Sequence, residues 1–123
     1  MRVLLSIKPE YAFKIFEGIK KFEFRKSIFR NPDIRTVVVY ASSPVQRVIG
    51  EFEIDRIFSL EPNQLWEITK EQSGISEEFF FEYFRERTVA HAIKIKRTTR
   101  YKRPLNLDKH FNVAPPQSYV YLS

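Results

Sequence analysis

The stretch "KPEYAFKIFEGIKKFEFR", residues 8–25, changes its hydrophobic period halfway along its length. Pro9 begins a helix, where its missing N–H has no consequence, and apolar residues then recur along one stripe that reaches Ile19. Gly18 suits the left-handed position that ends many helices. The second half has a period of two, with phenylalanines on one side and charges on the other. The stretch predicts a helix over residues 9–18 and then a strand with one buried face.

Outward from this stretch the sequence contains further strand and helix patterns. Strands are predicted over residues 1–7, 36–41, 46–60, 89–102 and 118–122, and helices over residues 62–74 and 76–87. Gly50, inside one of these strands, indicates a bulge or a sharp bend. Because strands and helices do not alternate regularly, a doubly wound parallel sheet is disfavoured. We expect one α+β domain over residues 1–123, with five to six mostly antiparallel strands curled into a small β-barrel and about three flanking helices. A flat α+β sandwich is the structural alternative.

The composition limits the kinds of site that the chain can build. Of its 123 residues 43% are hydrophobic, which is enough for one packed core. The absence of cysteine excludes disulfides and thiolate zinc sites, and His91 and His110 lie far apart in the sequence. We therefore expect no metal and no cofactor. The apolar run at the start is too short for a secretory leader or a membrane span, so a soluble, cytoplasmic protein without membrane contact is expected.

The charge of the chain favours an anionic partner. The formal net charge is +6 and the isoelectric point is near 9.7. Residues 94–103, "KIKRTTRYKR", form a basic stretch around Tyr101 whose candidates for contacts to a nucleic-acid backbone are Lys94, Lys96, Arg97, Arg100, Lys102 and Arg103. The alternative is a soluble edge hairpin that lysines protect from aggregation. RNA or a nucleotide is the expected partner, DNA is a further candidate, and the oligomeric state stays open.

The charges of the opening stretch follow the spacing Gly18-x-Lys20-x-x-Glu23-x-Arg25. Glu23 and Arg25 lie two apart on a strand, so their side chains leave the same face about 7 Å apart and can share one ligand. Arg25 can hold a phosphate with two parallel bonds, Glu23 can accept from the amino group of a base, and Lys20 can turn toward the same cleft. The alternative is a solvated strand face whose ion pair contributes at most about 1 kcal/mol. The spacing alone does not decide between a site and a surface.

This motif resembles the signature of the ASCH domain family, a branch of the PUA-like superfamily. The similarity continues through "LLSIKPEYAFKIFEG", "VVVYASSP", "VIGEFEI", "HAIKI" and "PPQSYVYL", which follow one another in the order of the family. The resemblance implies a PUA-like pseudo-barrel of five or six strands with a cleft beside the motif. It also implies binding of RNA or nucleotides, as in the compact members described as predicted regulators of transcription or RNA metabolism.

Some members of the family remove the acetyl group from acetylated cytidine, which makes an amidohydrolase the enzyme alternative. In those members a lysine of the motif activates a threonine nucleophile, and a glutamate from the following helical region assists. The resemblance places Lys20 at the lysine position but Glu23 at the threonine position, and Glu71 is a candidate for the glutamate. Because the usual nucleophile is missing, only a reaction with Glu23 as general base on water stays open.

Further residues are candidates for ligand contacts beside the motif: Lys8, Ser42, Gln117 and Ser118, all near strand ends. Ordinary turn chemistry is their alternative role. His91 is expected as a hydrogen-bonded core residue and Trp66 as a packing residue. A protein-interaction domain is the third hypothesis, because the two predicted acidic helices carry more phenylalanines than one helix stripe needs; burial of those phenylalanines is the simpler account.

Overall fold

The computed structural model describes residues 1–123 and contains one six-stranded sheet and four α-helices. The strands are β1 (Arg2–Ile7), β2 (Phe22–Arg25), β3 (Thr36–Ala41), β4 (Arg47–Leu60), β5 (Ala90–Leu105) and β6 (Tyr119–Leu122). The helices are α1 (Pro9–Phe16), α2 (Pro62–Thr69), α3 (Glu77–Tyr83) and α4 (Leu107–Phe111), and a short 3-10 helix, η1 (Lys70–Gln72), follows α2. None of the helices has the length and apolar character needed to span a membrane. The predicted α+β class is confirmed.

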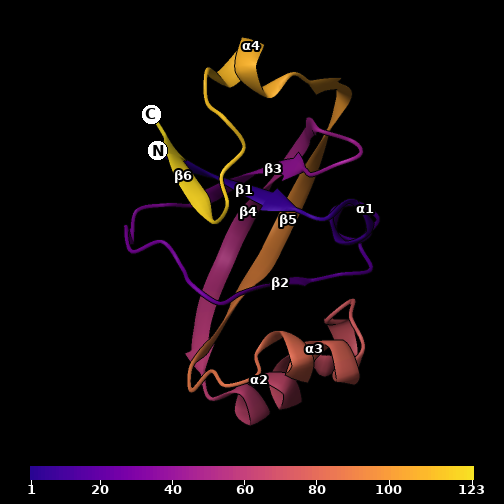
Figure 1. Cartoon of the computed structure of the whole chain (residues 1–123), viewed down its shortest axis with the longest axis vertical. Coiled ribbons are helices and arrows are strands. Elements are labelled where there is room, and N and C mark those ends of the chain that lie inside the picture. The colour runs from indigo at the N-terminus through magenta and orange to yellow at the C-terminus, as the bar shows by residue number, and fades with distance from the viewer.

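The sheet has the strand order β2-β5-β4-β3-β1-β6. β1 and β3 are parallel and the other neighbouring pairs are antiparallel, so the prediction of mostly antiparallel strands is confirmed. β3 is buried on both faces, because Val37 and Val39 pack in the cluster that contains α1 residues while Val38 and Tyr40 pack in the cluster that contains Leu107 of α4. Figure 1 shows the long β4 and β5 side by side along the length of the molecule.

The helices α2 and α3 lie together at one end of the molecule, and α4 lies at the opposite end (Figure 1). α2 and α3 pack on β2 and β5 through a cluster that consists of Phe22, Phe24, Leu65, Trp66, Phe80, Phe84, Ala90 and Ala92. The rings of Trp66 and Phe80 are 4.9 Å apart, which confirms the packing role predicted for the tryptophan. Several of the surplus phenylalanines are therefore core residues.

The predicted barrel does not close. β2 and β6 are the two edges of the sheet and share no backbone ladder, and each has only four residues. Side chains span the seam between them instead. The Arg25 guanidinium on β2 donates to the carbonyl of Ser118, just before β6, at 2.8 Å. The Tyr121 hydroxyl on β6 accepts from the backbone N–H groups of Arg30 and Asn31, each at 3.2 Å. The sheet is therefore curled but open, with a seam where its two short edge strands meet.

Some element boundaries differ from those predicted. The helix predicted over residues 9–18 ends at Phe16, because Gly18 takes a φ of +81° and ends the helical register. Ile19 therefore leaves the apolar stripe and is 58% exposed. The five residues of α4 were outside the prediction because they are too few to show a helical period. The bulge predicted at Gly50 is confirmed by the register shift of β4 against β5 beside it.

Candidate functional site

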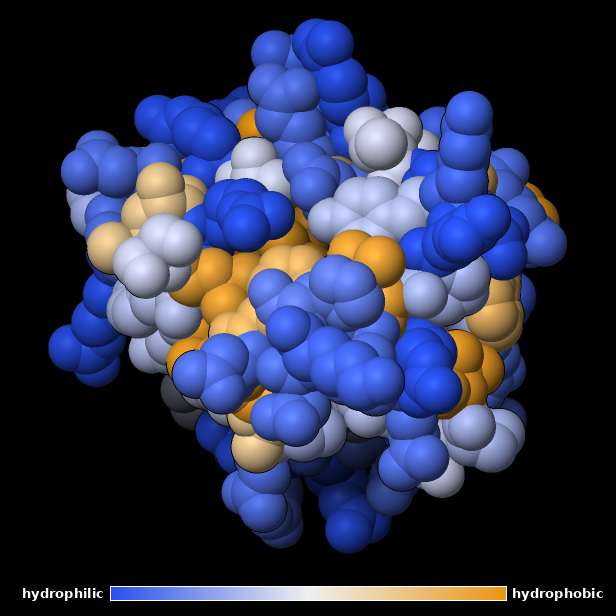
Figure 2. Space-filling view, turned by 90° about the horizontal axis from the view of Figure 1, so that it is seen from above, coloured by the Kyte–Doolittle hydropathy of each residue, from blue (hydrophilic) through white to orange (hydrophobic).

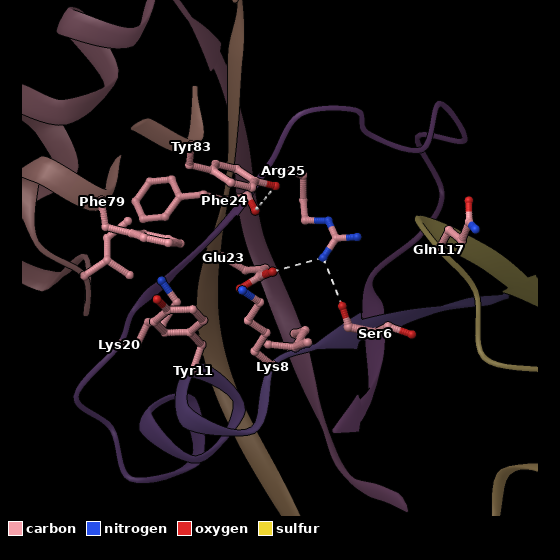
Figure 3. A pocket seen from close by; sticks show the side chains of 12 residues that line it. Ser6, Lys8, Tyr11, Lys20, Glu23, Phe24, Arg25, Phe79, Tyr83 and Gln117 are labelled. Carbon is pink, nitrogen blue, oxygen red and sulfur yellow. Dashed lines mark hydrogen bonds and ion pairs between the residues drawn. The ribbon is translucent and has the colours of Figure 1, made fainter. Parts of the chain in front are cut away.

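The charged motif residues Lys20, Glu23 and Arg25 face a cavity of about 240 Å³ that lies among the end of β1, α1, β2 and α3, next to the seam (Figure 3). Twelve residues line it, namely Ser6, Ile7, Lys8, Tyr11, Lys20, Glu23, Phe24, Arg25, Ile75, Phe79, Tyr83 and Gln117. Pockets for drug-sized ligands typically measure roughly 300–1,000 Å³. The smaller volume favours a ligand no larger than a single nucleoside.

Glu23 and Arg25 form an ion pair inside this cavity. Arg25 Nη1 lies 3.1 Å from Glu23 Oε2. The side chain of Arg25 is only 12% exposed and that of Glu23 only 7%. Arg25 also donates to the carbonyl oxygens of Ser6, at 3.2 Å, and Ser118, at 2.8 Å. The pair is therefore buried and is not part of a solvated strand face. Three hydrogen bonds from the Arg25 guanidinium already go to acceptors within the protein. The guanidinium therefore fixes the orientation of the Glu23 carboxylate rather than binding a phosphate through two parallel hydrogen bonds.

Lys20 is the most deeply buried charged residue of the motif, with 1% of its surface exposed. Its Nζ donates to the carbonyl of Ser73 at 2.7 Å and lies 4.7 Å from the ring centroid of Phe24 and 5.6 Å from that of Tyr11. Burial lowers the pKa of the Lys20 ammonium to about 8, although the nearby charge of Glu23 opposes this shift. The lysine predicted at the helix-to-strand junction thus turns into the cavity, and part of it is neutral near physiological pH.

An aromatic wall forms one side of the cavity. The ring centroids of Tyr11 on α1 and Phe79 on α3 are 5.6 Å apart, and Phe79 stacks on Tyr83 with 6.1 Å between centroids and 17° between planes. The Tyr83 hydroxyl donates to the carbonyl of Phe24 at 3.3 Å, which ties α3 to β2. Such a wall can stack against a planar ligand while the charged residues engage the polar edge of that ligand.

Two of the other predicted residues lie at the cavity and a further cation lies beside it. Lys8 is exposed and lines the cavity, as does Gln117 from the segment before β6. Lys26, the residue after β2, places its Nζ 4.9 Å from the ring centroid of Tyr83. The cavity therefore has positive charge near its mouth, in reach of a phosphate attached to a ligand inside.

Four predicted residues do not line the cavity. Gly18 ends α1. Ser42 lies in a turn, where its N–H donates to the carbonyl of Ile7 at 3.0 Å. Ser118 contributes to the site only through its backbone carbonyl, which accepts from Arg25. Glu71, the candidate glutamate of the hydrolase alternative, is exposed in η1 and is absent from the cavity lining. The residues present therefore lack both the threonine nucleophile and its helper carboxylate.

The cations of the basic stretch on β5 are partly neutralised. Lys94 lies 3.6 Å from Asp55, while Lys96 and Arg97 lie 3.8 Å and 2.8 Å from Glu53. These acids lie on the neighbouring strand β4. A count of charges along the sequence cannot show that they face the cations of β5. Half of the residues predicted to contact a nucleic-acid backbone therefore already have acidic partners on the protein.

The remaining cations of this stretch, Arg100, Lys102 and Arg103, form no ion pair within 4.0 Å. The Arg100 guanidinium lies 5.2 Å from the ring centroid of Phe13. Figure 1 shows β5 running up to α4, and Figure 2 views the molecule from that end, where hydrophilic side chains surround a smaller apolar area. This half of β5 is the more accessible candidate for phosphate contacts.

Several residues of the site were missed from the sequence, although a signal for some of them existed. Tyr11 follows the predicted site residue Lys8 by three positions, which places both on one face at the start of a helix beside the motif. The surplus aromatics of the second acidic helix, Phe79 and Tyr83, are four apart and form the wall. A search for aromatic residues on one face of the helices that flank the motif would have found these three rings.

Neither histidine joins the cavity, and no group of three or more His, Asp or Glu side chains gathers where a metal ion could be held. His91 lies on β5 opposite Ser59 of β4 and shares a hydrogen bond of 2.7 Å with its hydroxyl, as expected, but it is half-buried rather than in the core. What the cavity offers is a carboxylate, an ammonium and aromatic faces. These groups suit a planar polar ligand.

The curled open sheet and the charged, aromatic-lined cavity at its seam define a small α+β domain with a ligand-sized site. The family model described as "ASCH domain" matches residues 5–99, and the chain belongs to this family. The ASCH domain-containing ribonuclease of Zymomonas mobilis is 32% identical over 123 residues, which cover 97% of this chain and 82% of that protein. The crystal structure of ASCH from Zymomonas mobilis has a TM-score of 0.90 at 31% identity and covers 99% of this chain and 87% of that one. The resemblance inferred from the motif is confirmed.

A second relative is much longer than this chain. The ATP synthase subunit alpha of Ureaplasma parvum is 31% identical over 121 residues, which amount to 98% of this chain but only 15% of that protein. The chain therefore matches one part of that relative.

Proposed function

We propose that the chain binds RNA by taking one unpaired nucleotide into the cavity at the seam. The observation that carries this proposal is the combination of the buried Glu23 and Lys20 with a stacked aromatic wall in a space of about 240 Å³. Proteins that recognise RNA in single strands stack bases on aromatic side chains and bind the polar edges of those bases by hydrogen bonds. An unpaired nucleotide is required because a base inside a duplex cannot enter such a cavity without leaving its stack.

The charge around the cavity supports the same proposal. The exposed Lys8 and the nearby Lys26 can meet the phosphates on either side of the inserted nucleotide, and the chain as a whole carries +6. Its relative in Zymomonas mobilis is described as a ribonuclease, a protein that must engage RNA. Regulation of transcription or of RNA metabolism is the wider role that such binding would serve in this chain.

Binding is tested by fluorescence anisotropy with labelled single-stranded RNA of mixed sequence at low salt, with the matching duplex as a competitor. We expect binding of the single strand that Glu23→Gln weakens and that Glu78→Gln, the same change at an exposed position of α3, leaves intact. Circular dichroism melting checks that both variants are folded. Absence of binding tighter than millimolar to any RNA or nucleotide at low salt would refute the proposal.

RNA cleavage is the second candidate function. The observation that favours it is the likeness to the Zymomonas mobilis ribonuclease, which extends over 97% of this chain. Within the chain, the exposed Lys8 lies at the mouth of the cavity, where the phosphodiester next to a bound base would pass. An ammonium at that place can stabilise the charge that develops on the phosphate during cleavage.

Cleavage is tested by incubating labelled single-stranded RNA with wild-type protein and with Lys8→Met, purified in parallel to control for contaminating nucleases. We expect shorter products with the wild type and at least about 100-fold slower cleavage with the variant, since removing one such donor costs about 2.7–4 kcal/mol in known sites. Equal cleavage by both preparations would point to a contaminant or to a different catalytic group, and either result removes Lys8 from the proposed reaction.

A further inference from the structure

Lys20 and Glu23 have opposite charges and face the same cavity, yet they do not pair with each other. The ion pair that Glu23 forms within 4.0 Å is with Arg25, and Lys20 has no acidic partner at that distance. Both residues are buried, with 1% and 6% of their surfaces exposed. Burying a charge without a partner is costly, so an open gap between two opposite buried charges points to a polar group that occupies it in the bound state.

The hydrogen-bonding capacity left in the cavity describes that group. The Glu23 carboxylate only accepts, and the guanidinium of Arg25 occupies one site on Oε2 while Oε1 has no donor from the protein. The Lys20 ammonium has three donors, of which the protein's hydrogen bonds use one, to the carbonyl of Ser73. The ligand must therefore present donors to the carboxylate and an acceptor to the ammonium. A phosphate, which only accepts, is unsuited to the carboxylate side of this cavity.

Among the four RNA bases, guanine presents the edge that uses these groups most fully. Its N1–H and N2–H₂ are adjacent donors that match the two oxygens of one carboxylate, and its O6 is an acceptor beside them. Cytosine and adenine offer a single amino group next to ring acceptors, which leaves one carboxylate oxygen without a donor. Uracil offers one N–H between two carbonyls, and one of these carbonyls would face the carboxylate.

The protein holds the carboxylate ready for such a two-point contact. Arg25 is fixed by the carbonyl of Ser118 before β6 and by that of Ser6 on β1. The Glu23 carboxylate that it binds therefore has a preset orientation, and Figure 3 shows Arg25 between Glu23 and Ser6. The rings of Tyr11 and Phe79 stand beside it and can stack on the large face of a purine. Preorganised acceptors discriminate well because an unmatched base leaves them desolvated and unpaired.

We propose that the nucleotide taken into the cavity is a guanosine of single-stranded RNA, recognised by Glu23 through N1–H and N2–H₂ and by Lys20 through O6. This inference rests on the proposed function, since it names the base that the RNA site selects. Arg25 is a positioning residue in this scheme: it contacts Glu23 and need not touch the ligand. If the chain also cleaves RNA, the cuts lie next to guanosines.

The test uses single-stranded RNAs UUUUXUUUU in which X is guanosine, inosine, adenosine, cytidine or uridine, titrated against the full chain by fluorescence anisotropy. Inosine differs from guanosine only by the missing N2 amino group and so isolates the second donor. We expect guanosine to bind tightest and inosine at least about fivefold more weakly, because a good two-point contact to a base contributes about 1–3 kcal/mol of discrimination. Glu23→Gln should abolish the difference between guanosine and inosine, whereas Glu78→Gln should preserve it.

The outcomes separate this inference from the proposed function. Equal binding of all five RNAs, or tighter binding of any other base than guanosine, overturns the guanosine assignment and leaves RNA binding standing. Binding of none of them overturns both. The guanosine and inosine comparison needs only wild-type protein, so the assignment stays testable even if Glu23→Gln does not fold.

Discussion

The side chain of Lys20 lies against the backbone of Gly74, so close that a Cβ atom at Gly74 would stand 2.6 Å from both Cβ and Cγ of Lys20. Gly74 has a φ of +72° and follows η1, and the carbonyl of the preceding Ser73 accepts from Lys20 Nζ at 2.7 Å. The absence of a side chain at this glycine allows the segment after η1 to close over the motif lysine. The burial that lowers the pKa of Lys20 therefore depends on a residue distant from it in the sequence.

Replacement of Gly74 by alanine should destabilise the protein more than the same change at Gly18. Both glycines have positive φ, +72° and +81°, and an alanine there costs about 1–2 kcal/mol. At Gly74 the new methyl group also meets Lys20, which adds about 1–3 kcal/mol for overpacking. At Gly18 the nearest atom is Nζ of Lys21 at 3.9 Å, so only the backbone term applies. Urea denaturation of both variants measures the difference, and equal losses would show that Lys20 can move aside.

Lys20→Met should retain or raise the stability at pH 7 while it weakens ligand binding. The lowered pKa means that burial of the charged ammonium opposes folding, and methionine fills a similar volume without a charge. The carbonyl of Ser73 loses its donor in this variant, which lowers the gain in folding stability by about 1 kcal/mol. Thermal melting and RNA titration of the same sample provide the two readouts, with Lys109→Met as the control at an exposed lysine outside the proposed RNA contacts. A loss of stability well above 1 kcal/mol would instead make Lys20 a structural residue.

The stability difference between wild type and Lys20→Met should depend on pH in a defined window. The pKa of Lys20 is lowered from 10.5 in the unfolded chain to about 8 in the folded one, so between these values the unfolded chain binds a proton that the folded chain does not. Stability contributed by this lysine therefore rises as pH increases from 8 to 10.5, by up to about 3 kcal/mol, and is constant below 8. Urea denaturation of both proteins from pH 7 to 10.5 tests this. The raised pKa of Tyr101 affects both proteins equally and cancels when their stabilities are subtracted. A stability difference that does not change with pH would contradict the burial of the Lys20 charge.

The sequence predicted much of the fold because its signals are local. The change of period after Gly18 correctly placed α1 and β2, and the apolar run of β3 correctly indicated a central strand. The closure of the barrel was wrong because it depends on how two edge strands meet across the sheet. The contact between Arg25 and the carbonyl of Ser118 joins residues 93 positions apart, and no periodicity encodes it.

The part of the candidate site that local sequence spacing encodes was also predictable from the sequence. Glu23 and Arg25 share a face because they lie two apart on one strand, and the structure brings Lys20 to the same cavity. The wall that Phe79 and Tyr83 provide belongs to a distant helix, so its approach to the motif follows from tertiary packing. Ligand contacts of all these residues stay predictions until a ligand is bound.

Removal of Arg25 should be more harmful than removal of the whole charge pair. Arg25→Met leaves the 7% exposed Glu23 side chain without its counter-charge, and breaking a buried pair in this way costs about 3–5 kcal/mol. The double variant Glu23→Gln and Arg25→Met carries no unpaired carboxylate and should be more stable than Arg25→Met alone. A double-mutant cycle in urea should show a coupling of at least about 1 kcal/mol. Additive effects would mean that Arg25 acts only through its bonds to the backbone across the seam.

The unpaired cations at the α4 end of β5 should contribute more to the salt dependence of RNA binding than the paired ones. Lys96 and Arg97 share the single carboxylate of Glu53, which partly neutralises them, whereas Lys102 and Arg103 have no acid within 4.0 Å. Each phosphate contact on a single strand adds about 0.7 to the slope of log K against log salt. Lys102→Gln with Arg103→Gln should therefore flatten the slope by up to about 1.4, and Lys96→Gln with Arg97→Gln by less. Equal effects would mean that RNA displaces Glu53, and no effect from either pair would show that β5 lies away from the bound backbone.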